Sequence, residues 1–263
     1  MSLGVVTLYS LWPLLWQLLT SLKPEAELTT LPPLLPARWT WEHYRIVFAQ
    51  SPFPRLVLNS ALVASLSTIL TLLVGATAGM ALSQVRIPAR KPILALVLSV
   101  SMFPPIAIVS PLYILIRALG LRDTPWALIL LHTTFSLPLA IWILTNFFDK
   151  IPREIYAAAQ VDGCSPLQAL IHAVLPLAAP GVFTAAIFVF IYSWNEFLFA
   201  LTFSATARSR TVPVGIALFP GVQEVPWGDI AAATIVAIVP LLVLAALCQR
   251  RIVEGLTAGA VKG

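Results

Sequence analysis

Charged residues are scarce in this chain. Asp, Glu, Lys and Arg make up 10% of its 263 residues, whereas roughly 25% is usual in soluble domains. Hydrophobic residues make up 59%, and the mean hydropathy is +0.91. A water-soluble globule of this size could not bury so many apolar side chains, and a disordered chain would contain far fewer. The composition therefore indicates an integral membrane protein.

Further scarcities exclude other classes. Two cysteines are too few for a disulfide scaffold. His43, His132 and His172 lie far apart without metal-ligand spacing, so we expect no metal site and interpret His132 as a packed, hydrogen-bonded residue. The sequence has no Gly-x-x-x-x-Gly-Lys-Ser/Thr loop and no serine with a base at motif spacing, so we expect neither an enzyme nor a cofactor. The net charge of +5 suits anionic membrane lipid and is too weak to indicate nucleic-acid binding.

The apolar residues gather in six charge-free runs, each long enough for the roughly 20 residues with which a helix crosses a bilayer. The runs do not alternate as barrel strands do, so we predict an all-α integral membrane protein with six transmembrane helices. The runs are 1–22, 56–85, 92–116, 124–148, 163–195 (apolar from about Leu175) and 230–249. The first lacks a basic start and a cleavage site, which favours an uncleaved helix over a signal peptide.

Orientation does not follow from charge. Six spans place both termini on one side, but Lys and Arg divide equally between the two sides. The longest segment on the side opposite the termini, 23–55, carries Trp39 and Trp41, which fit either an interfacial aromatic belt or a binding surface. A second such segment, 204–229, is rich in proline and glycine and is predicted to be an irregular loop.

Prolines interrupt several runs. The pair Pro104-Pro105 is expected to break the third helix near its middle, because proline removes an amide donor and clashes with the preceding turn. The break fits a kink that improves packing, or a broken helix that lines a substrate route.

The stretch 149–182 predicts two short helices outside the membrane. Pro152 suits the first turn of a helix, Gly163 suits a left-handed cap, and Ser165-Pro166 suits the start of a second helix. The residues Ile155, Ala158, Ala159 and Asp162 recur at spacings of three and four and are therefore expected to share a face. Small residues on an exposed face would let another backbone approach closely; the alternative is an amphipathic linker lying on the membrane.

Four stretches carry a resemblance to a known family. They are Met102-Phe103-Pro104-Pro105, the run Glu154…Ala158-Ala159-x-x-Asp162-Gly163 followed by Pro176, Trp194-Asn195-Glu196-Phe197-Leu198-Phe199-Ala200-Leu201, and the C-terminal residues 249–263. Together they resemble permease subunits of bacterial ABC importers, and most closely the smaller permease subunit of maltose and trehalose importers. One position departs from the family's "EAA" motif, because Ala157 stands where glutamate usually precedes Ala-Ala.

The resemblance implies a type I ABC importer (MetI-like) permease fold in the bacterial inner membrane, with both termini cytoplasmic. The partners it implies are a second homologous permease, two ATP-binding cassette subunits, and an extracytoplasmic sugar-binding protein. The chain would comprise a first transmembrane helix (1–22), an extracytoplasmic segment (23–55), a core permease domain (56–249, with coupling loop 149–175 and outer loop 204–229) and a cytoplasmic tail (250–263).

Candidate site residues follow from the same resemblance. A cytoplasmic coupling helix would contact an ATPase through Glu154, Ala158, Ala159, Asp162 and Gly163. The tail would contact it through Gly255, Leu256, Thr257, Gly259 and Lys262. Candidates for the translocation pathway or its gate are Phe103, Pro104, Pro105, Trp194, Asn195 and Glu196. A carboxylate such as that of Glu196 is costly at membrane depth, and we favour a structural or gating role over direct sugar contact or an interface-level position.

The expected function is ATP-driven import of a sugar, such as trehalose, maltose or an oligosaccharide. Glycerol-phosphate import by the same branch is an alternative. A secondary transporter would need several ionisable groups inside the membrane, and Glu196 and His132 are too few for such a relay. A membrane enzyme fits least, since no catalytic constellation is visible.

Overall fold

The computed structural model describes residues 2–28, 33–85, 87–219 and 225–260, and in the last helix it describes side chains up to residue 248. Within these ranges all regular structure is helical, as predicted. The elements are α1 (Ser2–Thr20), α2 (Glu25–Leu28), α3 (Glu42–Arg45), the π-helix η1 (Ile46–Gln50), α4 (Phe53–Gln84), α5 (Arg90–Ser101), α6 (Pro105–Ala118), α7 (Pro125–Phe148), α8 (Arg153–Val161), α9 (Pro166–Ala169), the π-helix η2 (Leu170–Val174), α10 (Leu175–Leu177), α11 (Ala179–Asn195), α12 (Leu198–Phe203), α13 (Val212–Ala217) and α14 (Trp227–Ala260).

Long apolar helices lie in the predicted runs, but the predicted number of six spans is not confirmed. Among the described residues, three helices (α4, α7 and the Trp227–Cys248 part of α14) are long and apolar enough to cross a membrane alone. The number rises to five if each of two bent helix pairs counts as one span. The first predicted span forms α1, whose apolar stretch Gly4–Thr20 is shorter, so its crossing of the membrane stays a prediction.

Both bent pairs coincide with prolines. The predicted break at Pro104-Pro105 is confirmed, because α5 and α6 meet there at 84°. The predicted fifth span differs from the structure: its helix α11 begins at Ala179, and the preceding segment Pro166–Leu177 lies at 90° to it. Pro176 and Pro180 flank this second bend, where each lacks the amide proton that would continue a helical ladder.

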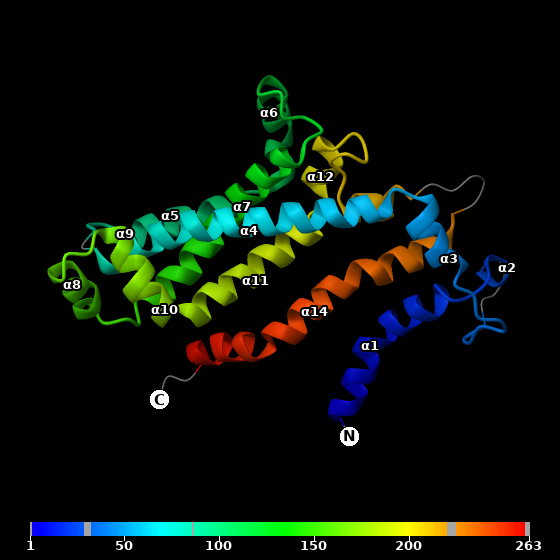
Figure 1. Cartoon of the computed structure of the whole chain (residues 1–263), viewed down its shortest axis with the longest axis horizontal. Coiled ribbons are helices and arrows are strands. Elements are labelled where there is room, and N and C mark those ends of the chain that lie inside the picture. The colour runs from blue at the N-terminus through cyan, green and yellow to red at the C-terminus, as the bar shows by residue number, and fades with distance from the viewer. Residues whose placement is uncertain (1, 29–32, 86, 220–224, 261–263) are drawn as a thin grey trace.

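The long helices lie side by side across the molecule, each in contact with the next. The helices α4 and α7 lie along one another, α11 contacts both, α14 contacts α11, and α1 contacts α14 (Figure 1). Glycines lie at these helix contacts: Gly75 faces Leu144 and Ala140 at ordinary contact distance, and Gly181 faces the ring of Phe147 much more closely. The helices α8 and α9 lie at one end of the long axis, and α2 and α3 at the other (Figure 1).

Three clusters of buried apolar side chains hold this arrangement together. One lies where α7, α8 and η2 meet and includes Leu144, Phe148, Tyr156, Leu170 and Val174. The second joins α7 to α12 and includes Leu128, Phe199 and Phe203. The third joins η1 and α4 to α13 and α14 and includes Val47, Phe53, Val212 and Ala232. The first cluster therefore ties the short helices α8 and α9 to the spans, and the third ties the segment around η1 to α14.

Candidate functional site

The predicted pair of short helices is present at one end of the molecule. The helix α8 ends before Gly163, whose φ of +87° lies in the left-handed region that glycine adopts without steric cost. The side chain of Ser165 caps α9 by a reciprocal capping box with Gln168. Pro152 precedes α8 as its N-cap residue, one position before the first turn in which the sequence placed it.

Polar contacts fasten the base of α8 to α4 and α5. The Gln84 amide donates to the carbonyls of Phe148, at 2.8 Å, and Ile151, at 3.4 Å, and so caps the C-terminal end of α7. The Arg153 guanidinium donates to the Ser83 carbonyl at 3.1 Å. The guanidinium of Arg90 in α5 forms an ion pair with Asp149. Sequence reasoning missed these contacts, since their partners are 59 to 70 residues apart.

The predicted docking face of α8 is divided in the structure. Ile155 and Ala159 pack against the buried cluster beside Tyr156, which is 8% exposed. The remaining predicted coupling residues, Glu154, Ala158, Asp162 and Gly163, are exposed. Tyr156 lies on the same side of α8 as Ile155 and Ala159, and spacing alone does not reveal that this side faces the protein. Val161, which the sequence did not single out, is 88% exposed and extends the outward stripe that contains Ala157 and Ala158.

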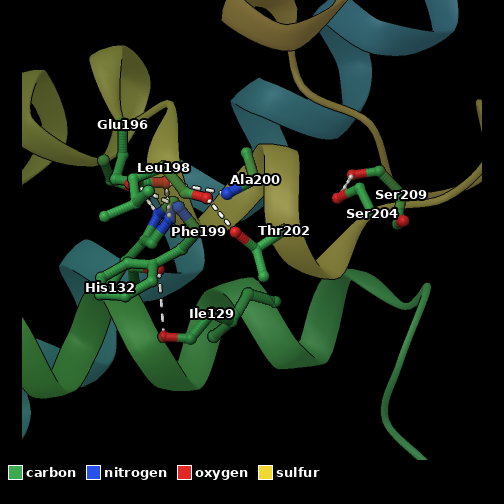
Figure 2. Close-up of polar contacts among 11 residues, drawn as sticks. Ile129, His132, Glu196, Leu198, Phe199, Ala200, Thr202, Ser204 and Ser209 are labelled. Atoms are coloured by element: carbon green, nitrogen blue, oxygen red, sulfur yellow. Dashed lines mark hydrogen bonds and ion pairs between the residues drawn. The ribbon is translucent and has the colours of Figure 1, made fainter. Parts of the chain in front are cut away.

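The side chain of Glu196 lies inside the subunit at the bend between α11 and α12. Its carboxylate accepts backbone hydrogen bonds from Phe199, at 2.8 Å, and Ala200, at 3.1 Å, so it caps the start of α12 (Figure 2). The Nε2 atom of His132 lies 3.2 Å from the same carboxylate, and Nδ1 lies 2.6 Å from Ser193 Oγ. His132 is thus a packed, hydrogen-bonded residue, as predicted. This burial favours a structural role for Glu196, because a sugar contact would require these bonds to break.

The other pathway candidates fall into two groups. Trp194 is buried and stacks on Phe190, with ring centroids 5.8 Å apart. Asn195 is exposed, and its amide donates to the Ile191 carbonyl at 2.8 Å. Phe103, Pro104 and Pro105 are also exposed, at the break between α5 and α6. Only the exposed residues present a surface to a substrate in this conformation.

Asp123 holds the first part of the predicted outer loop 204–229, through residues 205–209. It lies in the α6–α7 connection with a φ of +60° and accepts hydrogen bonds from the backbone of Ala205 and Thr206 and from the hydroxyls of Thr206 and Ser209. Partial burial would raise the pKa of this carboxyl, but the hydrogen bonds from Ser209 and Thr206 outweigh it and lower the pKa to about 2. The loop also contains a short helix, α13, which the prediction of an irregular loop did not include.

The predicted tail contacts fall largely outside the described part of the chain. Gly255, Leu256, Thr257 and Gly259 lie on the helical continuation of α14 beyond the described side chains, and Lys262 lies outside the described residues. Within the described residues, no three His, Cys, Asp or Glu side chains gather in a group that could hold a metal ion.

Solved structures of low sequence identity share this fold. The chain superimposes with a TM-score of 0.80, at 20% identity, on a subunit of a bacterial ABC transporter that imports the acidic polysaccharide alginate, and the match covers 94% of this chain and 92% of that one. A bacterial alginate ABC transporter in complex with an alginate pentasaccharide-bound periplasmic protein gives a TM-score of 0.58 at 17% identity, over 81% and 83% of the two chains.

Curated relatives match over almost their full length. The sulfoquinovosyl glycerol transport system permease protein SmoH of Agrobacterium fabrum is 44% identical over 99% of this chain and 92% of its own. The trehalose permease SugB of Mycobacterium tuberculosis is 43% identical over 97% and 93%. The trehalose/maltose permease MalG of Thermococcus litoralis is 40% identical over 98% and 94%.

A family model covers most of the same region. The model described as "Binding-protein-dependent transport system inner membrane component" matches residues 71–257, a range that runs from the middle of α4 into the end of α14. With the all-helical fold and the apolar helices, this match identifies a multi-pass inner-membrane permease that works with a binding protein. The chain therefore belongs to the family of inner-membrane components of binding-protein-dependent transport systems.

Proposed function

We propose that this chain is half of the translocation pathway of an ATP-driven importer for a carbohydrate, and that α8 docks on an ATP-binding cassette subunit. The observation that carries the proposal is the form of α8: an exposed stripe of small residues ending in Val161, on a helix whose base is fastened to the spans. Small side chains let a partner helix or cleft approach closely, and Val161, which is 88% exposed, adds an apolar side chain that such a partner would bury.

The contacts at the base of α8 suggest how force is transmitted. When two partner ATPases close on ATP, α8 moves with them as a rigid body, because Tyr156 is embedded in the apolar cluster shared with α7. Gln84 and Arg153 pass this displacement to α4, and the spans tilt between inward-facing and outward-facing arrangements. Because α8 docks on a cytoplasmic ATPase, residues 149–175 and both termini lie on the cytoplasmic side of the membrane. The loop 204–229 then meets the binding protein on the other side.

The substrate we propose is a glycoside of about disaccharide size, such as trehalose or maltose. Two of the relatives are named for trehalose, and the third is named for a sugar joined to glycerol. Phe103 and Asn195 are exposed and supply an aromatic ring and an amide, groups suited to stacking on sugar and to hydrogen bonding with its hydroxyls. A homologous second permease completes the pathway, and Glu196 has a structural role at the start of α12 rather than that of a sugar ligand.

Cysteine crosslinking tests the docking of α8. The native Cys164 and Cys248 are replaced by serine, and single cysteines are placed at Ala158, at Val161, and at Leu218 on the opposite end as a control. We expect crosslinks to an ATPase subunit from positions 158 and 161 and none from 218. Absence of a crosslink from both α8 positions in an assembled, transporting complex would refute the docking role.

Gly163→Asp tests coupling separately from assembly. A charged side chain at a position with φ of +87° should deform the end of α8 and reduce sugar uptake at least tenfold, roughly the effect of a 1.4 kcal/mol loss. Gly120→Asp is the matched control, since Gly120 also has a positive φ, +68°, but lies in the α6–α7 connection.

Uptake of labelled trehalose, maltose and glycerol-phosphate by the reconstituted importer identifies the substrate class.

A further inference from the structure

A buried charged cluster lies at the end of the molecule opposite α8. It forms where the chain after α1, the helix α3 and the first turn of α14 meet around His43, which is 4% exposed. The Nδ1 atom of His43 lies 2.7 Å from the Asp229 carboxylate, and Nε2 lies 2.8 Å from the backbone carbonyl of Lys23. The Glu25 carboxylate, whose side chain is 45% exposed, lies at the edge of this cluster, 4.0 Å from Nε2. These contacts join residues up to 186 positions apart in the sequence.

The hydrogen-bond geometry requires an extra proton in this cluster. A backbone carbonyl oxygen only accepts, so Nε2 of His43 must carry a hydrogen. If Nδ1 and the Asp229 carboxylate both lacked a proton, two lone pairs would face each other at 2.7 Å. A proton therefore lies between Nδ1 and the carboxylate oxygen, whichever of the two atoms holds it. His43 and Asp229 together bind one proton more than a neutral imidazole and a carboxylate do.

Other charged groups surround the pair. Lys23 is fully buried. Its ammonium group donates a hydrogen bond to the Pro33 carbonyl at 2.6 Å and lies 4.6 Å from the centroid of the Trp16 ring. The charged neighbours of His43 are Asp229 on α14, Glu25 on α2, Lys23 after α1, and Glu42 and Arg45 on its own helix α3. With the shared proton, the His43–Asp229 pair carries no net charge; without it, the pair carries one negative charge among these neighbours.

The imidazole ring of His43 has no free space between it and α14. A Cβ atom on Gly228 would lie 2.2 Å from Cε1 and 2.3 Å from Nε2 of His43, so the ring packs directly on the backbone of α14. Two further hydrogen bonds hold the same segment, from the Thr40 amide to the Leu22 carbonyl at 2.9 Å and between Ser21 and Tyr44 at 2.8 Å. Neither involves a histidine or a carboxylate.

We propose that the proton shared by His43 and Asp229 is a pH-sensitive latch that fastens residues 21–28 and 33–45 to the start of α14. Raising the pH removes this proton, places two acceptors in contact, and loosens the segment from α14. If the chain has the orientation given under the proposed function, the latch faces the cell exterior and responds to external pH. Only this last point rests on the proposed function.

Hydrogen exchange of the full chain in lipid nanodiscs tests the latch without requiring transport. After correction for intrinsic exchange, we expect amide protection in residues 33–45 to fall about ten- to hundredfold between about pH 5 and pH 9, the effect of losing one charge-assisted hydrogen bond on a histidine. His43→Gln should show low protection at both pH values, because glutamine cannot bind the extra proton. His172→Gln, at an exposed histidine, is the matched control and should respond like the wild type.

Gly228→Ala supplies an independent variant, since it displaces the ring but keeps both titrating groups. It should lower protection of residues 33–45 at pH 5. The proposal is overturned if wild-type protection is independent of pH, if His43→Gln keeps the wild-type response, or if Gly228→Ala leaves protection unchanged. None of these results depends on ATPase docking, so failure of the latch and failure of the importer assignment are distinguishable.

Discussion

The contact between α11 and α7 leaves no room for a methyl group at Gly181. A Cβ atom there would lie 2.2 Å from Cγ and 2.6 Å from Cβ of Phe147, whereas packed carbon atoms are roughly 3.5–4.0 Å apart. Because Cβ of Phe147 is attached to the backbone, rotation of the ring cannot relieve the overlap, and the two helices must separate. We expect Gly181→Ala to lower the free energy of unfolding by about 1–3 kcal/mol, the usual cost of overpacking.

Gly75 provides a matched control on α4. A Cβ atom there would lie 3.4 Å from Leu144 and 3.5 Å from Ala140, which is ordinary contact. Gly75→Ala should therefore be neutral or stabilising by up to about 1 kcal/mol, the gain in helix propensity. Gly79→Ala should fall between the two, since its nearest neighbours lie at 3.3 Å and include the backbone amide of Thr145.

Denaturant titration of the three variants in one membrane mimetic, followed by circular dichroism, ranks them. The expected order of stability is Gly75→Ala, then Gly79→Ala, then Gly181→Ala. If Gly181→Ala were as stable as Gly75→Ala, the close approach of α11 to α7 would be refuted. An equal loss in all three would show that glycine is needed for another reason than space.

Three further predictions concern hydrogen bonds. Glu196→Ala leaves two amide donors and His132 without an acceptor and should cost about 1–3 kcal/mol in thermal unfolding, with Glu196→Gln in between; no loss in Glu196→Ala would contradict the capping role. Because the pKa of Asp123 is lowered to about 2 in the fold, its stabilisation of loop 204–211 is present above about pH 4 and is lost as pH falls toward 2; Asp123→Asn should remove this acid dependence of loop hydrogen exchange. Ser165→Ala removes the cap of α9 and should reduce exchange protection there by about 1 kcal/mol; an unchanged α9 would rule out the capping box.

Much of the fold could be predicted because its signals are local. The break at Pro104-Pro105, the left-handed Gly163 and the Ser165 cap each depend on residues within a few positions, so composition and spacing were sufficient to predict them. The charge-free runs likewise predict the long helices, since the apolar length needed to cross a bilayer can be counted along the chain. The start of α11 was misplaced because Leu175–Leu177 is apolar but turns away between two prolines.

The candidate sites depend on contacts between residues that lie far apart in the chain. The sequence alone determined that this is a helical membrane permease with a short helix–glycine–helix element and a carboxylate at Glu196. Only the tertiary structure decided that Ala159 faces inward while Val161 faces outward, that His132 contacts Glu196, and that His43 lies against Asp229. The physical reason is that periodicity fixes which residues share a face, but the neighbour against which that face packs comes from another part of the chain.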